Sequence, residues 1–498
     1  MKILLIAPYV NLNVDPTIAR EDFYPSAALL HLAAMLRMNN YEPIIVDLNN
    51  AVVHAQKEKY IDYCNSIIKE SLQKHKPDLV GINCLFSGVF PDVLEFAKTV
   101  KTYSKELMVC IGGIHPTSYY QEILEKSKYV DCVAIGEGEN TIVALASAIK
   151  SKNYKAMEKI QAFAFRDKNG EIKVNTEKNY IENLDELPMP AWDLIDFNKF
   201  KMDLKTYYNP KKLTIQYKAA IFSSRACPLA CNFCDMFLVM GKTHRKRSVK
   251  TIVNEIEFLN KEFDVNYFSF MDDQLTLNRG HIIELCDEIL KRKLNIQFDT
   301  PNGLWINSLR ESLIAKMVEA GLVSASLAIE HGDEHIRNKI IGKMLERDKI
   351  FEVADILKKY KVMTSALFIM GFPEDTNETL KRTYDMMNEL QLDRMAVNTL
   401  IPLPGTKLMK QVLKEKLLIS NWNLDDIWKT PISLEQGDFV IKPYDMSIDE
   451  LHEWRETFDN MRHKYWTTNP LKRDTLVMPR EDYGKKNAAM YESVIYDK

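Results

Sequence analysis

The sequence predicts a mixed α/β protein in which a doubly wound parallel sheet precedes an incomplete barrel of parallel strands. Short apolar runs alternate with helical patterns across residues 1–155, and strand-like runs that end in polar loops recur across residues 211–410. Such alternation is typical of parallel strands joined by helical crossovers. Beyond residue 410 the pattern becomes mostly helical.

The length and composition are those of a globular protein with more than one domain. A chain of 498 residues exceeds what one hydrophobic core supports, and 46% apolar with 27% charged residues is ordinary for such proteins. We expect four segments. These are a Rossmann-like domain over 1–155, a hairpin and linker over 156–210, the barrel over 211–410, and a partly helical appendage or lid over 411–498.

Charge and targeting signals indicate a cytoplasmic protein. The net charge of −3 gives no field that favours nucleic acid, so we expect no nucleic-acid partner. The N-terminal run MKILLIAPYV is too short for a signal peptide, and no stretch approaches the ~18 apolar residues of a membrane span. In a reducing compartment the eight cysteines are not expected to form disulfides. The basic run 242–250 is interpreted as a solvated surface loop, with binding of a phosphate or carboxylate as the alternative.

The first domain is expected to contain five buried parallel strands. Each is a continuous aliphatic run, as in strands covered on both faces. The runs are Lys2–Pro8, Ile44–Leu48, Leu79–Cys84, Met108–Gly112 and Cys132–Ile135, with helical patterns over Ser26–Leu36, Ile61–Leu72 and Val93–Thr102. Ligands of such sheets bind beyond the carboxyl ends of the strands.

Three loops at these strand ends are rich in glycine, which lets a backbone approach a flat ligand closely. They read LFSG (85–88), GGIHPT (112–117) and GEGE (136–139), and each singly also fits a tight turn. With the helical run YPSAALLHLAAMLR, the last two resemble the cobalamin-binding domain in front of many radical-SAM enzymes. The resemblance implies cobalamin contacts from Ser87, Gly112, Gly113, His115, Gly136, Glu137, Gly138 and Glu139.

One departure from that resemblance concerns the cobalt ligand. Cobalamin domains that supply a lower histidine carry Asp-x-His-x-x-Gly after the first strand, and this chain has YVNLNVDPTIAREDFYP there. The resemblance therefore implies that no protein imidazole lies below the cobalt. His115 is expected to pack in its loop or to touch the edge of the ligand.

The segment between the two domains is expected to be ordered. Residues 162–174 alternate around Asn169-Gly170, which predicts a hairpin. NLDELPMPAWDLID (183–196) carries prolines and an aromatic residue, as an ordered crossing segment does.

The stretch SSRACPLACNFCDMF (223–237) contains three cysteines within a span of eight residues. They are Cys227, Cys231 and Cys234. From the residues alone the spacing fits a zinc site completed by His244, three unrelated thiols, a redox pair, or an iron–sulfur cluster. A cluster held by three thiolates leaves one iron open for substrate or cofactor. The triad favours the cluster over zinc.

Six strand-like segments around the cysteines predict a partial (β/α)6, TIM-like barrel, whose ligands lie at the carboxyl ends of the strands. They are Thr214–Ser223, Asn266–Met271, Ile296–Asp299, Ser324–Ile329, Thr364–Met370 and Met395–Ile401. Cys286 falls on the apolar stripe of the helical run 281–293, so we expect it in the core.

The Cys-x3-Cys-x-aromatic-Cys motif in this context resembles the radical-SAM superfamily, over about residues 1–410, and most closely the subgroup with a cobalamin domain in front. The resemblance implies that the three cysteines hold a 4Fe–4S cluster whose open iron binds S-adenosylmethionine (SAM). Reductive cleavage of SAM then gives a 5′-deoxyadenosyl radical. The implied SAM contacts are Phe233, Asp272, Asp273, Asn302, Glu330, Gly371 and Glu374, each of which also fits a helix cap or a turn.

The two implied cofactors suggest a cobalamin-dependent radical-SAM methyltransferase that acts on an unactivated carbon or phosphorus centre. Such a carbon cannot attack SAM directly, whereas a radical formed on it can accept a methyl group from methylcobalamin. The alternatives are a cobalamin-dependent oxidative cyclase or ring-rearranging enzyme and, in another class, a non-catalytic metal-binding sensor or scaffold. We expect an oxygen-sensitive enzyme with a small-molecule or peptide substrate and a one-electron reductant of the flavodoxin or ferredoxin type.

The last segment contains four of the six tryptophans, Trp422, Trp428, Trp454 and Trp466. Ser447 to Glu450 forms a capping box that predicts a helix to about Trp466. This helix is expected in either a lid over the barrel mouth or a packing appendage.

Overall fold

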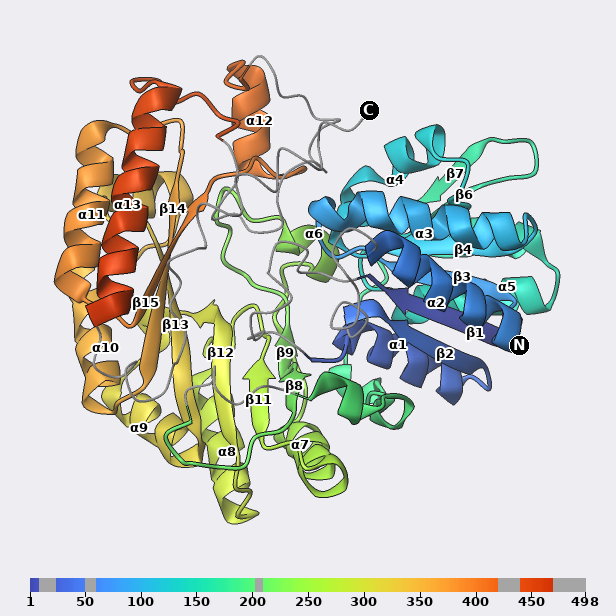
Figure 1. Cartoon of the computed structure of the whole chain (residues 1–498), viewed down its shortest axis with the longest axis horizontal. Helices are drawn as coiled ribbons and strands as arrows, with labels where there is room; N and C mark the ends of the chain where they lie inside the picture. The colour runs from blue at the N-terminus through green and yellow to red at the C-terminus, as the bar shows by residue number, and fades with distance from the viewer. Residues whose placement is uncertain (9–23, 50–59, 202–208, 420–438, 469–498) are drawn as a thin grey trace.

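The computed structural model of the chain describes residues 1–8, 24–49, 60–201, 209–419 and 439–468. Two α/β bodies lie side by side, with the N-terminal sheet on the right and the barrel on the left of Figure 1. In the described part of the chain, no helix is both long and apolar enough to cross a membrane.

The front sheet has seven strands in the order β2-β1-β3-β4-β5-β6-β7. They are β1 (Lys2–Ala7), β2 (Glu42–Asp47), β3 (Leu79–Asn83), β4 (Met108–Gly112), β5 (Cys132–Ala134), β6 (Phe163–Arg166) and β7 (Ile172–Asn175). The first five are parallel, and the predicted hairpin, β6–β7, adds on antiparallel. The strand order reverses direction between β1 and β3, which is the topological switch point where ligands of such sheets bind.

Helices cover both faces of this sheet, as predicted. On one face α1 (Ala27–Met38) and α5 (Glu139–Lys150) bury apolar side chains against β1 and β4. On the other, α2 (Tyr60–His75), α3 (Phe90–Tyr103) and α4 (Ile114–Lys126) enclose a second core. The strands are buried on both sides, which explains their continuous aliphatic sequences.

The GGIHPT stretch is less of a loop than the sequence suggested. Helix α4 already begins at Ile114, so His115 lies in its first turn. Gly113 makes this abrupt start possible, because its φ of 123° suits only glycine and its carbonyl oxygen accepts hydrogen bonds from the Thr117 amide and hydroxyl.

The linker packs against both bodies. The Trp192 side chain is 1% exposed, and its indole nitrogen donates a hydrogen bond to Glu255 Oε1 at 2.9 Å on the barrel helix α7 (Val249–Phe263). The Ala191 amide donates to the Leu30 carbonyl of α1. The 183–196 crossing is therefore ordered, as predicted. Short 3-10 helices occur at Ser87–Val89, Tyr154–Lys159, Leu184–Glu186, Trp192–Leu194, Phe197–Phe200 and Ile306–Ser308.

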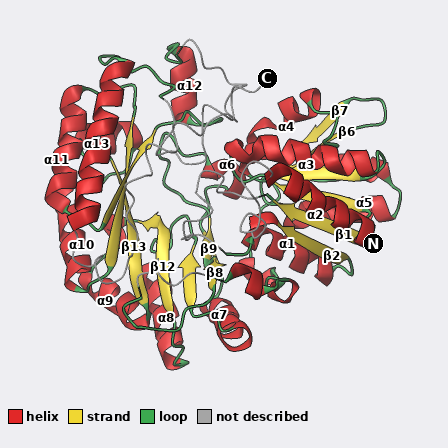
Figure 2. Cartoon of the chain, in the orientation of Figure 1, coloured by secondary structure: helices red, strands yellow, loops and turns green. Residues whose placement is uncertain are grey.

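The second sheet confirms the predicted half-open barrel. Its parallel strands, in the spatial order β8-β11-β12-β13-β14-β15, are β8 (Lys218–Ile221), β11 (Tyr267–Phe270), β12 (Gln297–Leu304), β13 (Leu322–Glu330), β14 (Met363–Met370) and β15 (Arg394–Thr399). The outer face is covered by α7, α8 (Arg279–Lys291), α9 (Glu311–Ala320), α10 (Arg347–Lys359) and α11 (Asn377–Leu390), as Figure 2 shows. Cys286 is 1% exposed in this core, as expected from its helical stripe.

Smaller elements complete the barrel. A two-stranded antiparallel ribbon, β9 (Ser224–Arg225) and β10 (Arg245–Lys246), encloses the short helix α6 (Met236–Met240). A π-helix spans Ile336–Ile341, and α12 (Lys407–Lys414) follows the last strand.

The C-terminal capping box is confirmed. The Glu450 amide donates to Ser447 Oγ at 3.2 Å, and the Ser447 amide donates to Glu450 Oε2 at 2.8 Å. The helix that follows, α13 (Ile448–Thr468), packs beside α11 and β15. This described part is an appendage on the barrel wall. Trp422, Trp428 and residues 420–438 lie outside the described residues, so a lid stays a prediction.

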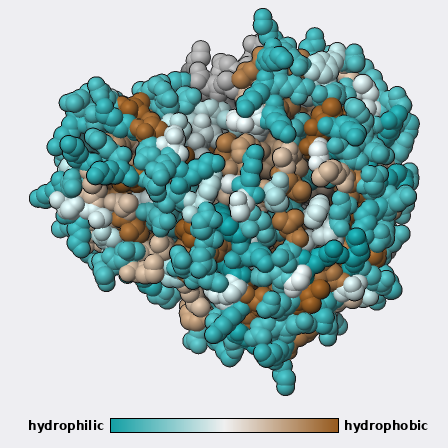
Figure 3. All heavy atoms as spheres, turned by 180° about the vertical axis from the view of Figure 1, so that it is seen from behind, coloured by the Kyte–Doolittle hydropathy of each residue, from teal (hydrophilic) through white to brown (hydrophobic). Residues whose placement is uncertain are grey.

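The back of the molecule is mostly hydrophilic, with apolar side chains in separate small groups (Figure 3).

Gly332 lies in the loop after β13, the fourth barrel strand, where the backbone packs closely against α11. A Cβ atom on Gly332 would lie 2.3 Å from Thr383 Cα, whereas one on Gly280 would lie 3.6 Å from its nearest neighbour. We therefore expect Gly332→Ala to lower the free energy of unfolding by about 1–3 kcal/mol. Gly280→Ala should leave it equal or slightly higher. Urea denaturation measures both, and equal midpoints would contradict this account.

Candidate functional site

The three predicted cluster cysteines lie on one loop between the two bodies (Figure 1). The loop begins after β8 and β9, and β10 pairs with β9 to close it. Cys227, Cys231 and Cys234 are free, partly buried thiols at the carboxyl end of the first barrel strand. This is the place at which (β/α) barrels bind ligands.

Burial raises the pKa of all three thiols. The pKa of Cys227 rises to about 11 and that of Cys234 to about 12, while that of Cys231 also rises, against the lowering effect of the Lys343 ammonium. Without a metal the thiols are therefore protonated at neutral pH. Metal ligation requires thiolates, so assembly of a cluster must release these protons.

The surroundings of the cysteines suit an iron–sulfur cluster. Cys231 and Phe233 pack against an apolar group that includes Ile341, Phe372 and Leu400. Exclusion of solvent and nearby charge are the means by which a protein sets the potential of such a cluster. Among the described residues, no three His, Cys, Asp or Glu side chains are arranged around a point where a single metal ion would sit.

His244, the zinc ligand considered from the sequence, is partly buried. Burial lowers its pKa, and its Nε2 has no hydrogen-bond partner among the described residues.

Lys343 is a residue of this site that sequence reasoning missed. It is 8% exposed, and its ammonium lies 2.7 Å from Glu330 Oε1. Glu330 and the thiols of Cys231 and Cys227 act to raise the pKa of Lys343 against the effect of burial. A buried ion pair thus lies beside the cysteines. The only available signal was one lysine in an apolar stretch, IIGKML, beyond the fourth strand.

Glu330 adopts a φ of 70°, unusual for a residue other than glycine, next to an irregularity in the β13–β14 pairing. This conformation places its carboxylate on Lys343. Backbone strain of this kind is often found at functional sites.

Asp272 and Asp273 anchor the start of the cysteine loop. Asp272 Oδ1 accepts from Ser223 Oγ at 2.6 Å and from Ser224 Oγ at 2.5 Å. Asp273 is held near the Ala226 amide, and burial together with Asp272 raises its pKa to about 6. Asp272 therefore has a structural task, and SAM contacts from these two residues stay a prediction.

The loop GFPE (371–374), which follows β14, carries a carboxylate with a free oxygen. Glu374 Oε1 accepts from Gln411 Nε2 of α12 at 2.8 Å, while Oε2 is buried without a hydrogen-bond partner among the described residues. Gly371 has a φ of 100°, and its amide donates to Asp375 Oδ2 at 2.7 Å.

Asn232 presents a second unpaired acceptor. It lies between the second and third cysteines, and its Oδ1 is likewise buried without a partner in the part of the chain described. Its backbone carbonyl accepts from the Leu408 amide, so α12 contacts both this loop and Glu374. Asn302 is exposed and bonds the Met271 carbonyl, so its predicted role is untested.

In the front domain His115 is packed, as expected. It is 4% exposed between the Phe90 and Tyr119 rings, and Ser87 Oγ lies 3.0 Å from its Nδ1. Burial lowers the pKa of His115 to about 4, so the ring is neutral at physiological pH.

The glycines of the front loops have contacts within the protein. A Cβ on Gly113 would lie 2.4 Å from the Cys84 carbonyl oxygen, and one on Gly136 would lie 3.3 Å from the Val239 carbonyl oxygen of α6. Gly112 borders Ala134, and Gly138 borders Leu32. Cobalamin contacts from these four glycines stay a prediction.

The third strand end carries two exposed apolar side chains. Leu85 is 36% and Phe86 is 40% exposed, at the switch point of the sheet. A large apolar surface at that position fits the flat face of a corrinoid.

Glu137 and Glu139 bind arginines of the barrel. Glu139 Oε1 lies 2.6 Å from Arg225 Nη2, and Glu137 Oε1 lies 2.7 Å from Arg245 Nη2. Burial acts to raise the pKa of Glu139, but Arg225 outweighs it and the pKa is lowered. Their predicted contact with cobalamin is untested, whereas their role at the domain interface is visible.

The run 242–250 was predicted to be a solvated loop, and this was wrong for its two arginines, which are buried. Arg245 and Arg247 are 6% exposed and pair with Glu137 and Glu255, while Lys242, Lys246 and Lys250 are exposed. The alternation of buried arginine and exposed lysine follows the two-residue period of a strand, a signal that the sequence contained.

Two family models match the chain. The model "B12 binding domain" covers residues 17–146, and the model "Radical SAM superfamily" covers residues 221–387. The second range contains all three predicted cluster cysteines.

Curated relatives resemble most of the chain. "Uncharacterized methyltransferase PH0819" of Pyrococcus horikoshii is 28% identical over 85% of each chain. "Anaerobic magnesium-protoporphyrin IX monomethyl ester cyclase" of Rubrivivax gelatinosus is 26% identical over 78% of this chain and 66% of the relative. "Cytidylyl-2-hydroxyethylphosphonate methyltransferase" of Streptomyces wedmorensis is 24% identical over 81% of each.

Solved structures share the whole fold. TsrM of Kitasatospora setae, a radical S-adenosylmethionine methyltransferase with tryptophan and a SAM analogue bound, superposes with a TM-score of 0.68 at 15% identity, over 97% of this chain and 91% of TsrM. OxsB, a cobalamin-dependent S-adenosylmethionine radical enzyme, superposes with a TM-score of 0.70 at 17% identity, over 99% of this chain and 71% of OxsB. At such identities the likeness shows the fold alone.

Asp92, in the first turn of α3, has a buried carboxyl group whose effect on stability can be measured. Burial, and to a lesser degree Glu95, raises its pKa from 3.8 to about 7. The folded state therefore binds more protons than the unfolded state between these values, and its stability falls as pH rises through that window. Relative to the wild type, Asp92→Asn should gain about 1.4 kcal/mol of stability for each pH unit climbed between these two pKa values.

Urea denaturation of both proteins across this pH range measures the difference. Asp62→Asn, which removes an exposed carboxylate from the first turn of α2, provides the control for the loss of a charge at the surface. If the difference in unfolding free energy between Asp92→Asn and the wild type did not change with pH, the raised pKa of the buried Asp92 carboxyl would be refuted.

Proposed function

The chain is a radical-SAM enzyme with a B12 binding domain in front, and on that premise we propose that it is a methyltransferase acting on an unactivated carbon or phosphorus centre. The observation that carries the proposal is the position of the cysteine loop, which is held between the two domains and contacts both. Two of the relatives that match most of the chain are named methyltransferases, and one of them is named for a phosphonate substrate.

The cofactors are a 4Fe–4S cluster, SAM and cobalamin; when bound, they supply an electron, a radical source and a methyl carrier. The chain's own residues bind and orient these groups. Cys227, Cys231 and Cys234 provide thiolates, and the apolar wall around Phe233 excludes water.

Lys343 is the residue that we assign to the carboxylate of SAM. An ammonium has three donor hydrogens, of which Glu330 takes one, so Lys343 can hold a second carboxylate. The buried acceptors Asn232 Oδ1 and Glu374 Oε2 would receive donors of the bound SAM, its ammonium and its hydroxyl or amino groups. Each buried acceptor otherwise bears the cost of desolvation without a bond.

On the cobalamin side, Leu85 and Phe86 would lie against the corrinoid. The packing of His115 between two rings leaves it unsuited to ligate cobalt, in line with the missing histidine motif. The proposal further includes a one-electron reductant of the flavodoxin or ferredoxin type and a cytoplasmic location, which suits oxygen-sensitive thiolate ligands.

A second candidate reaction is oxidative cyclisation with the same cofactors. It is favoured by the similarity to the Rubrivivax gelatinosus cyclase. The mass of the product separates the two reactions, because methylation adds one CH2 unit and cyclisation removes hydrogen or adds oxygen.

The function is tested with anaerobically reconstituted protein and methyl-labelled SAM. We expect label on the bound corrinoid and, with a small-molecule extract of the source cells, in a product. Replacement of all three cluster cysteines by alanine should abolish 5′-deoxyadenosine formation. Cys286→Ala, a matched cysteine in the core, should retain it. Formation of 5′-deoxyadenosine without transfer of label to corrinoid or product would refute the methyltransferase proposal.

The buried Lys343–Glu330 pair is tested by comparing single and double variants. Lys343→Met alone leaves a buried carboxylate unpaired and should lower the unfolding free energy of the cofactor-free protein by about 3–5 kcal/mol. The double variant Lys343→Met/Glu330→Met should recover most of this stability, yet bind SAM at least about tenfold more weakly. Isothermal titration of the cluster-loaded protein measures binding, and wild-type affinity in the double variant would contradict the assigned role.

A further inference from the structure

We propose that Glu137 and Glu139 are positioning residues that fix the base of the cysteine loop on the cobalamin-binding domain and so set the separation between the two cofactors. The inference rests on the proposed function, because the separation matters only if both cofactors bind. It gives the GEGE loop a task other than contact with cobalamin.

The geometry begins with the ribbon that closes the cysteine loop. In the β9–β10 pairing Arg225 lies directly opposite Arg245, and the chain between them carries all three cysteines and α6. Arg225 is two residues from Cys227. Any displacement of these two arginines therefore moves the ends of the loop that holds the cluster.

The front domain holds both arginines. Glu137 Oε1 lies 2.7 Å from Arg245 Nη2 and 3.4 Å from Arg225 Nη1, so one carboxylate bridges the two guanidinium groups. Its Oε2 accepts from Arg245 Nη1 at 3.0 Å and from the Ile181 amide at 2.8 Å. Glu139 Oε1 completes the set at 2.6 Å from Arg225 Nη2.

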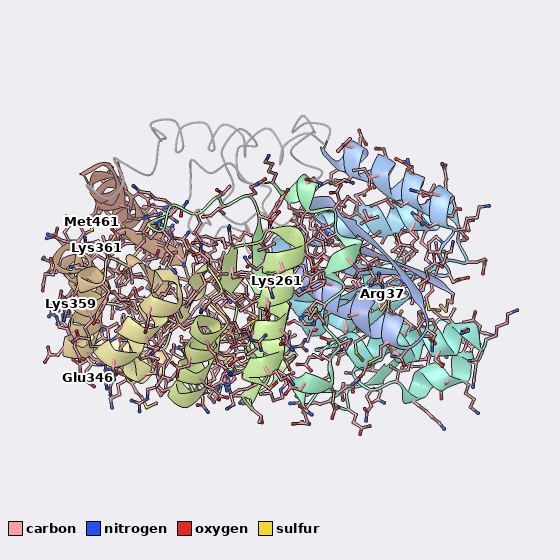
Figure 4. All side chains as sticks on the ribbon, turned by 90° about the horizontal axis from the view of Figure 1, so that it is seen from below. Arg37, Lys261, Glu346, Lys359, Lys361 and Met461 are labelled. Carbon is pink, nitrogen blue, oxygen red and sulfur yellow. The ribbon has the colours of Figure 1, made fainter. Side chains whose placement is uncertain are left out.

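Charge and burial constrain the geometry of these four side chains. All four side chains are 9% exposed or less, and two like charges directly opposite on a ribbon repel each other. Glu137 provides the counter-charge between them, and bidentate arginine–carboxylate pairs fix direction as well as distance. A contrasting pair is Arg37–Asp193, also bidentate at 2.7 Å between α1 and the linker, but at the surface (Figure 4).

The cysteine loop is held from the other sides as well. Helix α6 packs beside α4 of the front domain, and Gly136 lies close to the Val239 carbonyl. Asp272 of the barrel bonds Ser223 and Ser224 at the start of the ribbon. Only the Glu137–Glu139 contacts join the base of the loop by charge to the domain that binds cobalamin, among the described residues.

Reaction between two held groups depends on such fixed placement, since a misplacement of about 1 Å can cost about 100-fold in rate. The variants that test the role are Glu137→Gln, Arg245→Gln, their double, and Glu139→Gln. Arg37→Gln is the matched control, because it removes a bidentate pair of the same chemistry that lies away from the ribbon. Glu139→Gln is the mildest change, since Arg225 keeps Glu137.

The main readout is the distance between the reduced cluster and bound cob(II)alamin, measured by pulsed electron paramagnetic resonance on holoenzyme with wild-type iron and cobalt content. We expect the distribution to shift or broaden by about 1 Å or more in each interface variant, with at least about tenfold slower labelling of the corrinoid from methyl-labelled SAM. The double variant should equal the worse single variant, because both changes remove the same contact. Arg37→Gln should match the wild type.

A second readout requires no cofactor and separates this inference from the proposed function. In cofactor-free protein, hydrogen–deuterium exchange of amides in 136–139 and 224–246 should quicken about tenfold in Glu137→Gln and Glu139→Gln, and stay unchanged in Arg37→Gln. Loss of cobalamin with unchanged amide exchange would overturn the inference in favour of direct cofactor contact. An unaltered cofactor distance in variants that retain both cofactors would overturn it as well.

Discussion

The structure depends on how one loop is anchored. The segment from Ala226 to His244 carries the three cysteines, and the β9–β10 ribbon lies at its base. Asp272 of the barrel accepts hydrogen bonds at the start of this ribbon, and Glu137 and Glu139 of the front domain form ion pairs with its arginines. A buried set of charges like this is stable only when every member is paired, because an unpaired ion in the interior is costly. These paired charges favour the observed orientation of the two domains, in which the loop lies at the carboxyl ends of strands from both sheets.

This placement explains why two sheets of common architecture together support a particular chemistry. Each sheet alone offers a ligand site at its strand ends, and fold alone does not specify a reaction. The thiols, the buried Lys343–Glu330 pair and the unpaired acceptors on Asn232 and Glu374 gather on the barrel side. The exposed Leu85 and Phe86 lie at the switch point of the front sheet. The site is thus divided between a polar, charged half that suits SAM and an apolar half that suits a corrinoid.

The sequence was sufficient for the fold because its signals were local. Continuous aliphatic runs predicted the parallel strands of the front sheet, and strand-like segments that end in polar loops predicted those of the barrel. The Asn169-Gly170 turn predicted the hairpin, and Ser447 with Glu450 predicted the start of α13. The cysteine spacing likewise predicted a cluster on the loop after β9, and that assignment stays a prediction. What the sequence did not reveal were partners far apart in the chain, because Glu137 and Arg245 are 108 residues apart and no local pattern joins them. Glu330 was predicted from the sequence, but its partner Lys343 was missed because a single lysine in an apolar stretch carries no motif. His115 was taken for a loop residue because Gly113 starts its helix without a side-chain cap.

The proposed reaction requires that one polypeptide carries both an iron–sulfur cluster and a corrinoid. Metal and sulfide analysis of protein purified without oxygen from cobalamin-supplemented cells tests this directly. We expect about four irons, about four sulfides and about one cobalt per chain, with the absorbance of an iron–sulfur protein. Zinc in place of iron, or iron without cobalt under these conditions, would contradict the account.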